Sequence, residues 1–199
     1  MSIWFCSDQH FSHARISEMC GRGFAATPEG IQEMNEVIIA RHNSVVTPED
    51  TVIFLGDVAM GRLADSLPLV DRLNGAEKIL ILGNHDRPSH LYHHKTAEKR
   101  LEWTNEYLKY FNSIHSSHTL KVGDVEFVLH HLPYLDDSFV DHAYEGRYSE
   151  HQPKDEGKWL IHGHVHGAWR QKGRQINVGI DAWDLTPVNL DTIMEIVNA

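Results

Sequence analysis

Five short polar clusters in this chain carry side chains that bind metal ions, and each cluster directly follows an apolar run. The clusters are Asp8-Gln9-His10, Gly56-Asp57, Gly83-Asn84-His85-Asp86, His130-His131-Leu132-Pro133 and Gly163-His164-Val165-His166. Carboxylate, imidazole and amide groups are ordinary protein ligands of divalent cations. Side chains of these types, gathered in one place, are typical of a hydrolase that uses two metal ions.

The apolar runs explain how the clusters can meet. Each run has the length and the β-branched or aromatic content of a buried strand. The runs cover Ile3–Cys6, Val52–Leu55, Ile79–Leu82, Val125–Leu129 and Trp159–Ile161. In open α/β sheets, ligands and reactive groups gather beyond the carboxyl ends of the strands, so we expect the five clusters to converge on one spot.

Each cluster taken alone has an ordinary structural interpretation. Asp8 and His10 fit a turn carboxylate beside a surface histidine, Gly56-Asp57 fits a simple turn, and Asn84 fits a capping residue in a polar turn. Five clusters in order, each directly after a strand-like run, are hard to produce by chance. We put the probability that the whole set has only a structural role at roughly one in twenty, given the false-positive risk of motifs.

Spacing within the clusters narrows the choice of ligands. Asp8 and His10 are two residues apart, so on an extended segment they point the same way and can reach one ion. His130 and His131 are neighbours on a strand and face opposite sides, so only one of them is expected to be a ligand. The residues alone do not decide which one.

The remaining elements follow from periodicity and turn signals. Thr27 and Pro28 begin a helix whose apolar face carries Ile31, Met34, Val37 and Ile38. We expect a loop over 11–26, a short helix ending at Asn74-Gly75, a helix over 97–111 with Leu101, Tyr107, Leu108 and Phe111 inside, a hairpin over 119–129, a strand around 175–178 and a terminal helix over 191–197. This order predicts a mixed-sheet α/β sandwich.

Length and composition favour one globular domain over residues 1–199. No run approaches the roughly 20 apolar residues of a membrane span, so we expect no membrane partner. The start of the chain does not resemble a signal peptide, and its two cysteines show no disulfide spacing, which predicts a reduced, cytoplasmic location. A net charge of -10 disfavours long nucleic acids as partners. The oligomeric state stays open.

In their order, the five clusters resemble the calcineurin-like metallophosphoesterases. Their pattern is Asp-x-His, Gly-Asp, Gly-Asn-His-Asp/Glu, a His after a strand, and Gly-His-x-His, and all five blocks occur here. The likeness is strongest to a small bacterial and phage subgroup, through Arg22-Gly23-Phe24 and through the block from Asn177 to Trp183. The resemblance implies a β-sandwich of two mixed sheets flanked by helices, in four αββα layers.

The resemblance also implies the roles of the cluster residues. One metal would be bound by Asp8, His10, Asp57 and His166. The other would be bound by Asp57, Asn84, His131 and His164, with His131 chosen because the family's ligand is followed by one residue and then Pro. His85 would be the catalytic histidine, with Asp86 as the partner that fixes its tautomer.

Two departures from the family pattern limit the choice of substrate. Many members have a second acidic residue three positions after the bridging Asp, where this chain has Met60. The protein-phosphatase branch continues with Asp-Arg-Gly and has Glu after Gly-Asn-His, and neither feature is present. A phosphatase acting on phosphoserine or phosphothreonine proteins is therefore disfavoured.

The expected activity is hydrolysis of a small nucleotide-type phosphodiester or of a phosphomonoester, by attack of a hydroxide that bridges two divalent cations. The mixed nitrogen and oxygen ligands suit Mn²⁺, our first expectation, with Fe, Ni²⁺ or Zn²⁺ as alternatives. The predicted substrate contacts are Arg22, Phe24, Arg87 and Arg147. The alternatives are a nuclease on short or single-stranded nucleic acid and a non-catalytic metal-binding scaffold.

Overall fold

Two five-stranded mixed sheets form the frame of the molecule. The computed structural model describes residues 1–92, 96–135 and 148–199. In the first sheet the strand order is β10 (Val188–Asn189), β1 (Ile3–Cys6), β2 (Thr51–Phe54), β3 (Glu77–Ile81) and β4 (Ser113–His115). In the second it is β5 (His118–Val122), β6 (Val125–Leu129), β7 (Trp159–His162), β9 (Gln175–Asn177) and β8 (Gln171–Lys172).

Strand direction places the polar clusters at one end of the frame. Strands β1 to β4 run parallel in the first sheet, and only β10 is antiparallel to its neighbour. In the second sheet β6, β7 and β9 run parallel, with β5 and β8 antiparallel at the two edges. The parallel strands of each sheet therefore present their carboxyl ends together.

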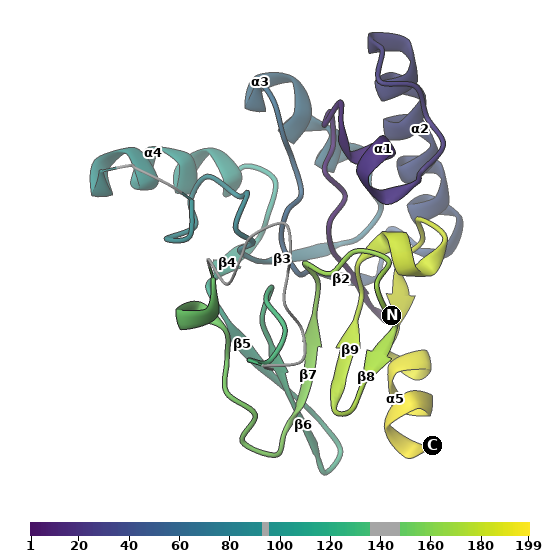
Figure 1. Ribbon diagram of the computed structural model, residues 1–199, viewed down its shortest axis with the longest axis vertical. Helices are drawn as coiled ribbons and strands as arrows, with labels where there is room; N and C mark the ends of the chain where they lie inside the picture. The colour runs from purple at the N-terminus through teal and green to yellow at the C-terminus, as the bar shows by residue number, and fades with distance from the viewer. Residues whose placement is uncertain (93–95, 136–147) are drawn as a thin grey trace.

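Helices flank the sheets, as expected (Figure 1). The α-helices are α1 (Ile16–Cys20), α2 (Pro28–Val45), α3 (Leu63–Ser66), α4 (Ala97–Tyr107) and α5 (Leu190–Asn198). In the described part of the chain there are also three short 3₁₀ helices, namely η1 (Leu67–Arg72), η2 (Ser149–His151) and η3 (Ile180–Trp183). Among the described residues, no helix combines the length and the apolar character that a membrane span needs.

Alternating side chains on β2 build two separate apolar cores. Val52 and Phe54 join the core between the first sheet and its helices, to which α2 contributes Met34 and Ile38. Ile53 and Leu55 point to the other face and join the core between the sheets, with Phe127, Leu129, Ile161 and Ile176 of the second sheet. Each face of the first sheet is thus covered by its own apolar layer. The first sheet is held between helices and the second sheet.

Helix α2 begins as predicted, because the Thr27 side chain accepts a hydrogen bond from Gly30 N at 3.2 Å. The prediction for α4 was wrong in extent and for half of its inner residues, since Tyr107 and Phe111 are buried as expected. The helix ends at Tyr107, and it buries Trp103, while Leu101 and Leu108 are 61% and 46% exposed. Trp103 and Tyr107 are four residues apart and share one face, from which Leu101 points away.

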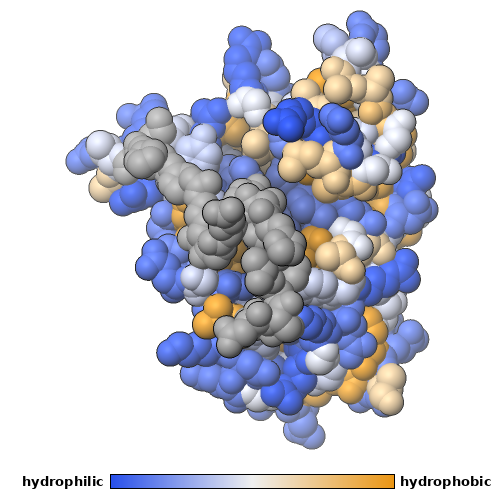
Figure 2. All heavy atoms as spheres, viewed as in Figure 1, coloured by the Kyte–Doolittle hydropathy of each residue, from blue (hydrophilic) through white to orange (hydrophobic). Residues whose placement is uncertain are grey.

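The face seen in Figure 1 is largely hydrophilic at its surface (Figure 2). Apolar atoms gather at the upper right of this view, over the region of α1 and the segment that leads to α2. Met19 in α1 is 57% exposed, whereas Ile16 at the start of the same helix is buried. The short helix is therefore tied to the molecule by its first turn.

Candidate metal centre

The Asp57 carboxylate lies between two imidazoles at the carboxyl ends of the strands. Its Oδ2 atom is 3.6 Å from His10 Nε2, which follows β1, and 3.5 Å from His131 Nε2, which follows β6. All three side chains are almost fully buried. A carboxylate from the first sheet thus meets ligand atoms of both sheets, which is the placement that a bridging ligand requires.

The other predicted ligands gather on the two sides of Asp57. On the His10 side, the rings of His10 and His166 are 5.2 Å apart, and Asp8 Oδ1 is 4.0 Å from His10 Nε2. On the other side, His131 Nε2 is 2.9 Å from the side-chain oxygen of Asn84, and its ring is 5.3 Å from that of His164. The structure therefore brings the seven predicted ligands together in two sets that share Asp57. Their roles as ligands stay a prediction.

Hydrogen bonds on the far side of the rings orient two of the histidines. His131 Nδ1 lies 2.6 Å from the carbonyl oxygen of Leu55, and His166 Nδ1 lies 2.7 Å from the Asp181 carboxylate. Each oxygen accepts the Nδ1 proton, so Nε2 faces the cluster. Partners of this kind fix the tautomer and the ring plane of a metal-binding histidine.

The donor atoms fit a divalent cation. Ligand atoms of Asp8, His10 and His166 lie within 4.8 Å of one another, as do those of Asp8, Asp57 and His131. Asp8 Oδ1 and both ring nitrogens of His10 are buried without a hydrogen-bond partner among the described residues. Each unsatisfied buried polar group costs about 1–3 kcal/mol, and a cation would satisfy the oxygen and one nitrogen.

The carboxylates at the centre draw positive charge to two of its histidines. Burial opposes ionisation of Asp57, but the neighbouring histidines prevail and hold its pKa well below the usual range. Burial lowers the pKa of His10 well below its usual range, which keeps this ring unprotonated. Although burial opposes protonation, Asp57 raises the pKa of His131 to about 9, and the hydrogen bond to Asp181 raises that of His166 to about 11.

Most of the clustered residues have a strained backbone. Asp8, His10, Asp57, His164 and His166 all have φ between 49° and 69°, in the left-handed region. The expectation that Asp8 and His10 point together from an extended segment was therefore wrong. They reach the same site from a left-handed turn. Such conformations cost on the order of 1–3 kcal/mol each and cluster at functional sites.

Two glycines are required by the close approach of neighbouring segments. A Cβ atom at Gly83 would lie 2.2 Å from Asp57 Oδ1, and one at Gly163 would lie 2.0 Å from Ser7 Oγ. Both positions are in the polar clusters that follow the strands. Gly83 therefore allows two loops of the first sheet to pack directly against each other, and Gly163 allows a loop of the second sheet to pack against a loop of the first.

The catalytic candidates lie beside the shared carboxylate. The His85 ring is 5.4 Å from the His10 ring, and His85 N donates to Asp57 Oδ1 at 2.7 Å. The Asp86 carboxylate accepts three backbone N–H bonds, from Asp57, Val58 and Gly83, at 2.8–3.2 Å. Asp86 therefore holds the loop that carries Asp57. Its pairing with the His85 ring stays a prediction.

The structure gives the predicted substrate contacts other partners. Arg22 has a side chain only 1% exposed and forms a two-bond ion pair with Asp181. Phe24 is partly buried against the core beside the helices, and Arg87 donates to the carbonyl oxygen of Gly61 at 2.7 Å. Arg147 lies outside the described residues. These contacts point to a positioning role for Arg22.

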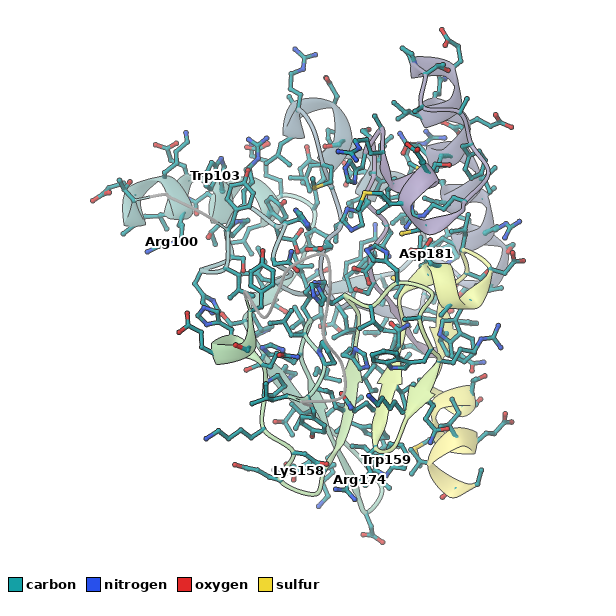
Figure 3. All side chains as sticks on the ribbon, in the orientation of Figure 1. Arg100, Trp103, Lys158, Trp159, Arg174 and Asp181 are labelled. Carbon is teal, nitrogen blue, oxygen red and sulfur yellow. The ribbon has the colours of Figure 1, made fainter. Side chains whose placement is uncertain are left out.

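Two further residues at the site have no role assigned from the sequence. Asp181 holds His166 and lies where η3 meets the α1 region (Figure 3). The His13 ring lies 5.3 Å from the His10 ring and is tilted against it, and burial and the nearby His85 lower the pKa of His13. His13 lies three residues after the predicted ligand His10, and this spacing could have indicated from the sequence that His13 belongs to the site. Asp181 stood in a motif block without a chemical role.

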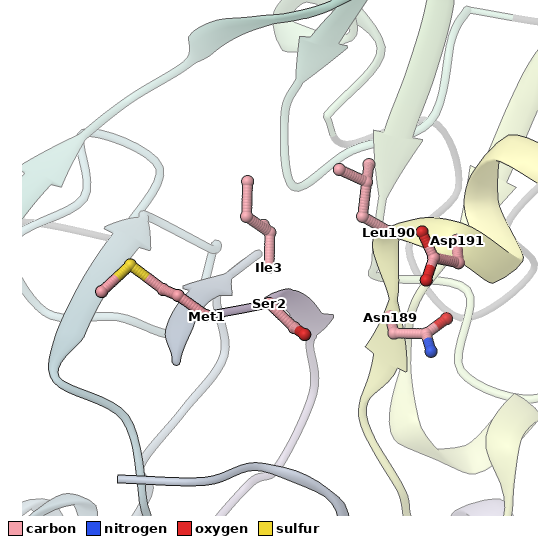
Figure 4. Close-up of a pocket in the computed structure, with 6 residues that line it drawn as sticks. All are labelled: Met1, Ser2, Ile3, Asn189, Leu190 and Asp191. Atoms are coloured by element: carbon pink, nitrogen blue, oxygen red, sulfur yellow. The ribbon is translucent and has the colours of Figure 1, made fainter. Parts of the chain in front are cut away.

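A separate hollow lies at the opposite end of β1. It is lined by residues 1–3 and 189–191, at the amino end of this strand (Figure 4). The Asn189 side chain there caps α5 by accepting from Thr192 N at 2.8 Å. The hollow is therefore a feature of the chain ends and is distinct from the metal centre.

Two mixed sheets flanked by helices, with groups that could hold a metal ion at their strand ends, are the architecture of the metallophosphoesterases. The family model for calcineurin-like phosphoesterases matches residues 1–168, and the chain belongs to this family. The Gene 66 protein of Mycobacterium phage D29 is 34% identical over 209 residues, which cover 99% of this chain and 96% of the relative. The uncharacterised protein MJ1445 of Methanocaldococcus jannaschii is 29% identical, over 98% of this chain and 90% of its own length.

A solved structure shares the fold. The protein of unknown function AQ665 from Aquifex aeolicus superposes with a TM-score of 0.63 at 24% identity, and the match covers 98% of each chain. At this identity the likeness shows the arrangement of sheets and helices alone. The substrate has to be inferred from the chain itself.

Proposed function

We propose that this protein is a phosphoesterase that uses two divalent cations to hydrolyse a small phosphodiester of the nucleotide type or a phosphomonoester. The observation that carries the proposal is the position of Asp57 between His10 and His131, with ligand atoms 3.5 and 3.6 Å away. A buried carboxylate shared by two sets of nitrogen and oxygen ligands is the arrangement that two-metal hydrolases use.

The donor set indicates which residues would hold each cation. Asp8, His10 and His166 would bind one, and Asn84, His131 and His164 the other, with Asp57 shared. When bound, the two cations would supply Lewis-acid activation of water and of the phosphoryl group. Nitrogen and oxygen ligands suit Mn²⁺, Fe, Ni²⁺ or Zn²⁺, and Mn²⁺ is our first choice.

His85 has the position of a proton donor. Its ring lies beside that of His10 at the edge of the cluster, and its side chain is partly exposed. Its backbone N–H donates a hydrogen bond to Asp57, so the loop that carries the His85 ring is tied to the bridging carboxylate. We assign to His85 a hydrogen bond or a proton transfer to the phosphoryl or leaving oxygen.

The partner that this site favours is small. The chain carries a net charge of -10, which repels an extended polyanion, whereas bound cations would make the site itself locally positive. A nuclease acting on short single strands is the competing enzyme, and a non-catalytic scaffold is the competing non-enzyme. The presence of all seven predicted ligand residues and of His85 supports the enzyme.

The test is hydrolysis by metal-stripped protein of bis-p-nitrophenyl phosphate and p-nitrophenyl phosphate. Mn²⁺, Ni²⁺, Zn²⁺ and Mg²⁺ are added back singly, and the Asp57→Asn variant is measured in parallel. Diester hydrolysis that needs both a cation and Asp57 supports a two-metal phosphodiesterase. Monoester activity alone assigns a phosphatase. A strong, salt-sensitive preference for oligonucleotides would favour the nuclease. The absence of hydrolysis of every substrate with every cation would favour the scaffold.

A further inference from the structure

A buried ion pair stands behind one half of the metal centre. Arg22 Nε and Nη2 donate to the two carboxylate oxygens of Asp181 at 2.7 and 2.9 Å. The two residues are 159 positions apart, and their side chains are 1% and 3% exposed. A two-bond arginine–carboxylate pair has a fixed geometry, so it holds the two segments at a defined distance and angle.

The pair contacts residues that contribute to a single metal site. Asp181 Oδ2 is 2.7 Å from His166 Nδ1 and so orients this ring. Arg22 uses its remaining donors on the backbone of the first cluster, to the carbonyl oxygens of Asp8 at 2.6 Å and Gln9 at 2.8 Å. These carbonyls flank the left-handed residues Asp8 and His10, with φ of 62° and 49°.

The second half of the centre rests on other contacts. His131 is oriented by the carbonyl oxygen of Leu55, and Asn84 lies on the loop that Asp86 holds through backbone amides. The hydrogen bonds of Arg22 and Asp181 described above go to the segment of Asp8 and Gln9 and to His166. The two halves of the centre are therefore supported mainly by different parts of the chain, and the hydrogen bond from His164 N to Asp8 Oδ2 at 2.9 Å joins them.

We propose that the Arg22–Asp181 pair is a positioning brace for the cation site of Asp8, His10 and His166, and that it sets the affinity of that site without acting on the site of Asn84, His131 and His164. The inference rests on the proposed function, since it assumes that the centre binds two cations. It gives Arg22 a role in holding ligands in place of the substrate contact expected from the sequence.

The charge of Arg22 excludes a third cation site beside Asp181. The Cys20 thiol, His166 and Asp181 also lie within 4.8 Å of one another, as a third cation site would require. Both oxygens of Asp181 are engaged by the Arg22 guanidinium, whose positive charge repels a cation at that position. The pair therefore supports a neighbouring cation and does not bind one.

The test measures Mn²⁺ binding directly, by the electron paramagnetic resonance signal of free Mn²⁺ during titration of metal-stripped protein. Wild type is expected to bind two ions. Asp181→Asn and Arg22→Lys should weaken one binding class about 10- to 100-fold, the usual effect of removing a partner that orients a ligand, and leave the other unchanged. Arg22→Lys keeps the charge but loses the two-bond geometry.

A matched control is available close by. Arg41 pairs with Asp184 at 2.6 Å, linking α2 to the residue after η3, but these side chains are 39% and 87% exposed. Arg41→Lys should leave both Mn²⁺ classes unchanged. Circular dichroism of the metal-free variants checks that they are folded, and Asp181→Asn, which preserves side-chain shape, decides the question if Arg22→Lys is unfolded.

Combined variants assign the affected class. Asp181→Asn should add nothing to His10→Ala, which already removes the braced site, but should weaken the ion that remains in His131→Ala. If wild type binds two ions and Asp181→Asn leaves both affinities unchanged, the brace is overturned but the proposed function is not. An equal loss of both classes would also overturn it, because the effect would then be general. Wild type that binds no Mn²⁺, and no Zn²⁺, Ni²⁺ or Fe²⁺ in equilibrium dialysis, would overturn the brace and the proposed function together.

Discussion

Two buried aspartates stand at opposite ends of β2 and have opposite surroundings. Asp50, just before the strand, accepts hydrogen bonds from Ser2 N at 2.6 Å, Thr47 N at 2.9 Å and Trp4 Nε1 at 3.2 Å. Asp57, just after it, turns Oδ2 towards the ring nitrogens of His10 and His131. Their exposed fractions are nearly equal, at 3% and 2%.

The difference shows how to separate a structural carboxylate from a functional one. Asp50 is surrounded by protein donors, so its charge is satisfied within the fold. Asp57 shares its surroundings with other ligand atoms, including the unpartnered Oδ1 of Asp8 and ring nitrogens of His10. Burial alone does not distinguish the two residues. What distinguishes them is whether the neighbours donate hydrogen bonds or could bind the same ion.

The sharpest test of this comparison is Asp57→Asn. We expect kcat/KM on the preferred aryl phosphate to fall roughly a thousandfold, equivalent to about 4 kcal/mol of lost transition-state stabilisation. The metal-free variant should unfold at a lower urea concentration, because the depressed pKa of Asp57 means that its charge stabilises the folded chain, and Asn removes its pairing with His131. Activity within tenfold of wild type would refute the bridging role.

His85→Ala tests the proton donor beside the shared carboxylate. Turnover should fall roughly a hundredfold, at the lower end of the effect of a general acid. The metal content should stay at the wild-type value, because the His85 contact to Asp57 is made by the backbone. Elemental analysis of the purified variant provides the control, and unchanged turnover would remove His85 from the mechanism.

Asp50→Asn tests the structural carboxylate and should change stability. Its backbone hydrogen bonds lower the pKa of Asp50 to about 2, against roughly 3.9 in an unfolded chain. Because the folded pKa is depressed, the stabilisation is present above about pH 4 and is lost as the pH falls towards 2. The variant should show a lower urea midpoint at pH 7, and the difference from wild type should shrink between pH 4 and 2. Activity per folded molecule should be unchanged.

Asp184→Asn should have the smallest effect. Asp184 pairs with Arg41, but its side chain is 87% exposed, and exposed ion pairs contribute about 0–1 kcal/mol. We expect urea midpoint, Mn²⁺ affinity and activity to match wild type. A measurable loss of Mn²⁺ affinity would show that the η3 segment as a whole, and not Asp181 in particular, supports the centre.

Elements with a clear period could be predicted from the sequence, and those formed by pairing could not. The hairpin of β5 and β6 and the cap of α2 at Thr27 follow local rules, and both are present. Strands β8 and β10 have two residues each and exist only because a neighbouring strand pairs with them. A two-residue strand has no periodicity that a sequence could reveal.

The same distinction applies to the site. The ligand types could be predicted because they follow apolar runs, but the left-handed backbone at Asp8 and His10 is set by the turn they form. The function of Arg22 depends on Asp181, which is 159 residues away in the sequence. From the sequence alone, the Arg22 guanidinium was therefore predicted to contact the substrate. A contact across the fold, which leaves no local pattern, decides the role of Arg22.

The centre draws its side chains from both sheets, with Asp8, Asp57 and Asn84 following strands of the first and His131, His164 and His166 following strands of the second. A bound cation would therefore cross-link the two layers. Ions that bind only the folded chain stabilise it by mass action, so above the dissociation constant each tenfold fall in free cation should lower the free energy of unfolding by about 1.4 kcal/mol per site. The thermal stability of the protein would then report the free-metal concentration of its surroundings.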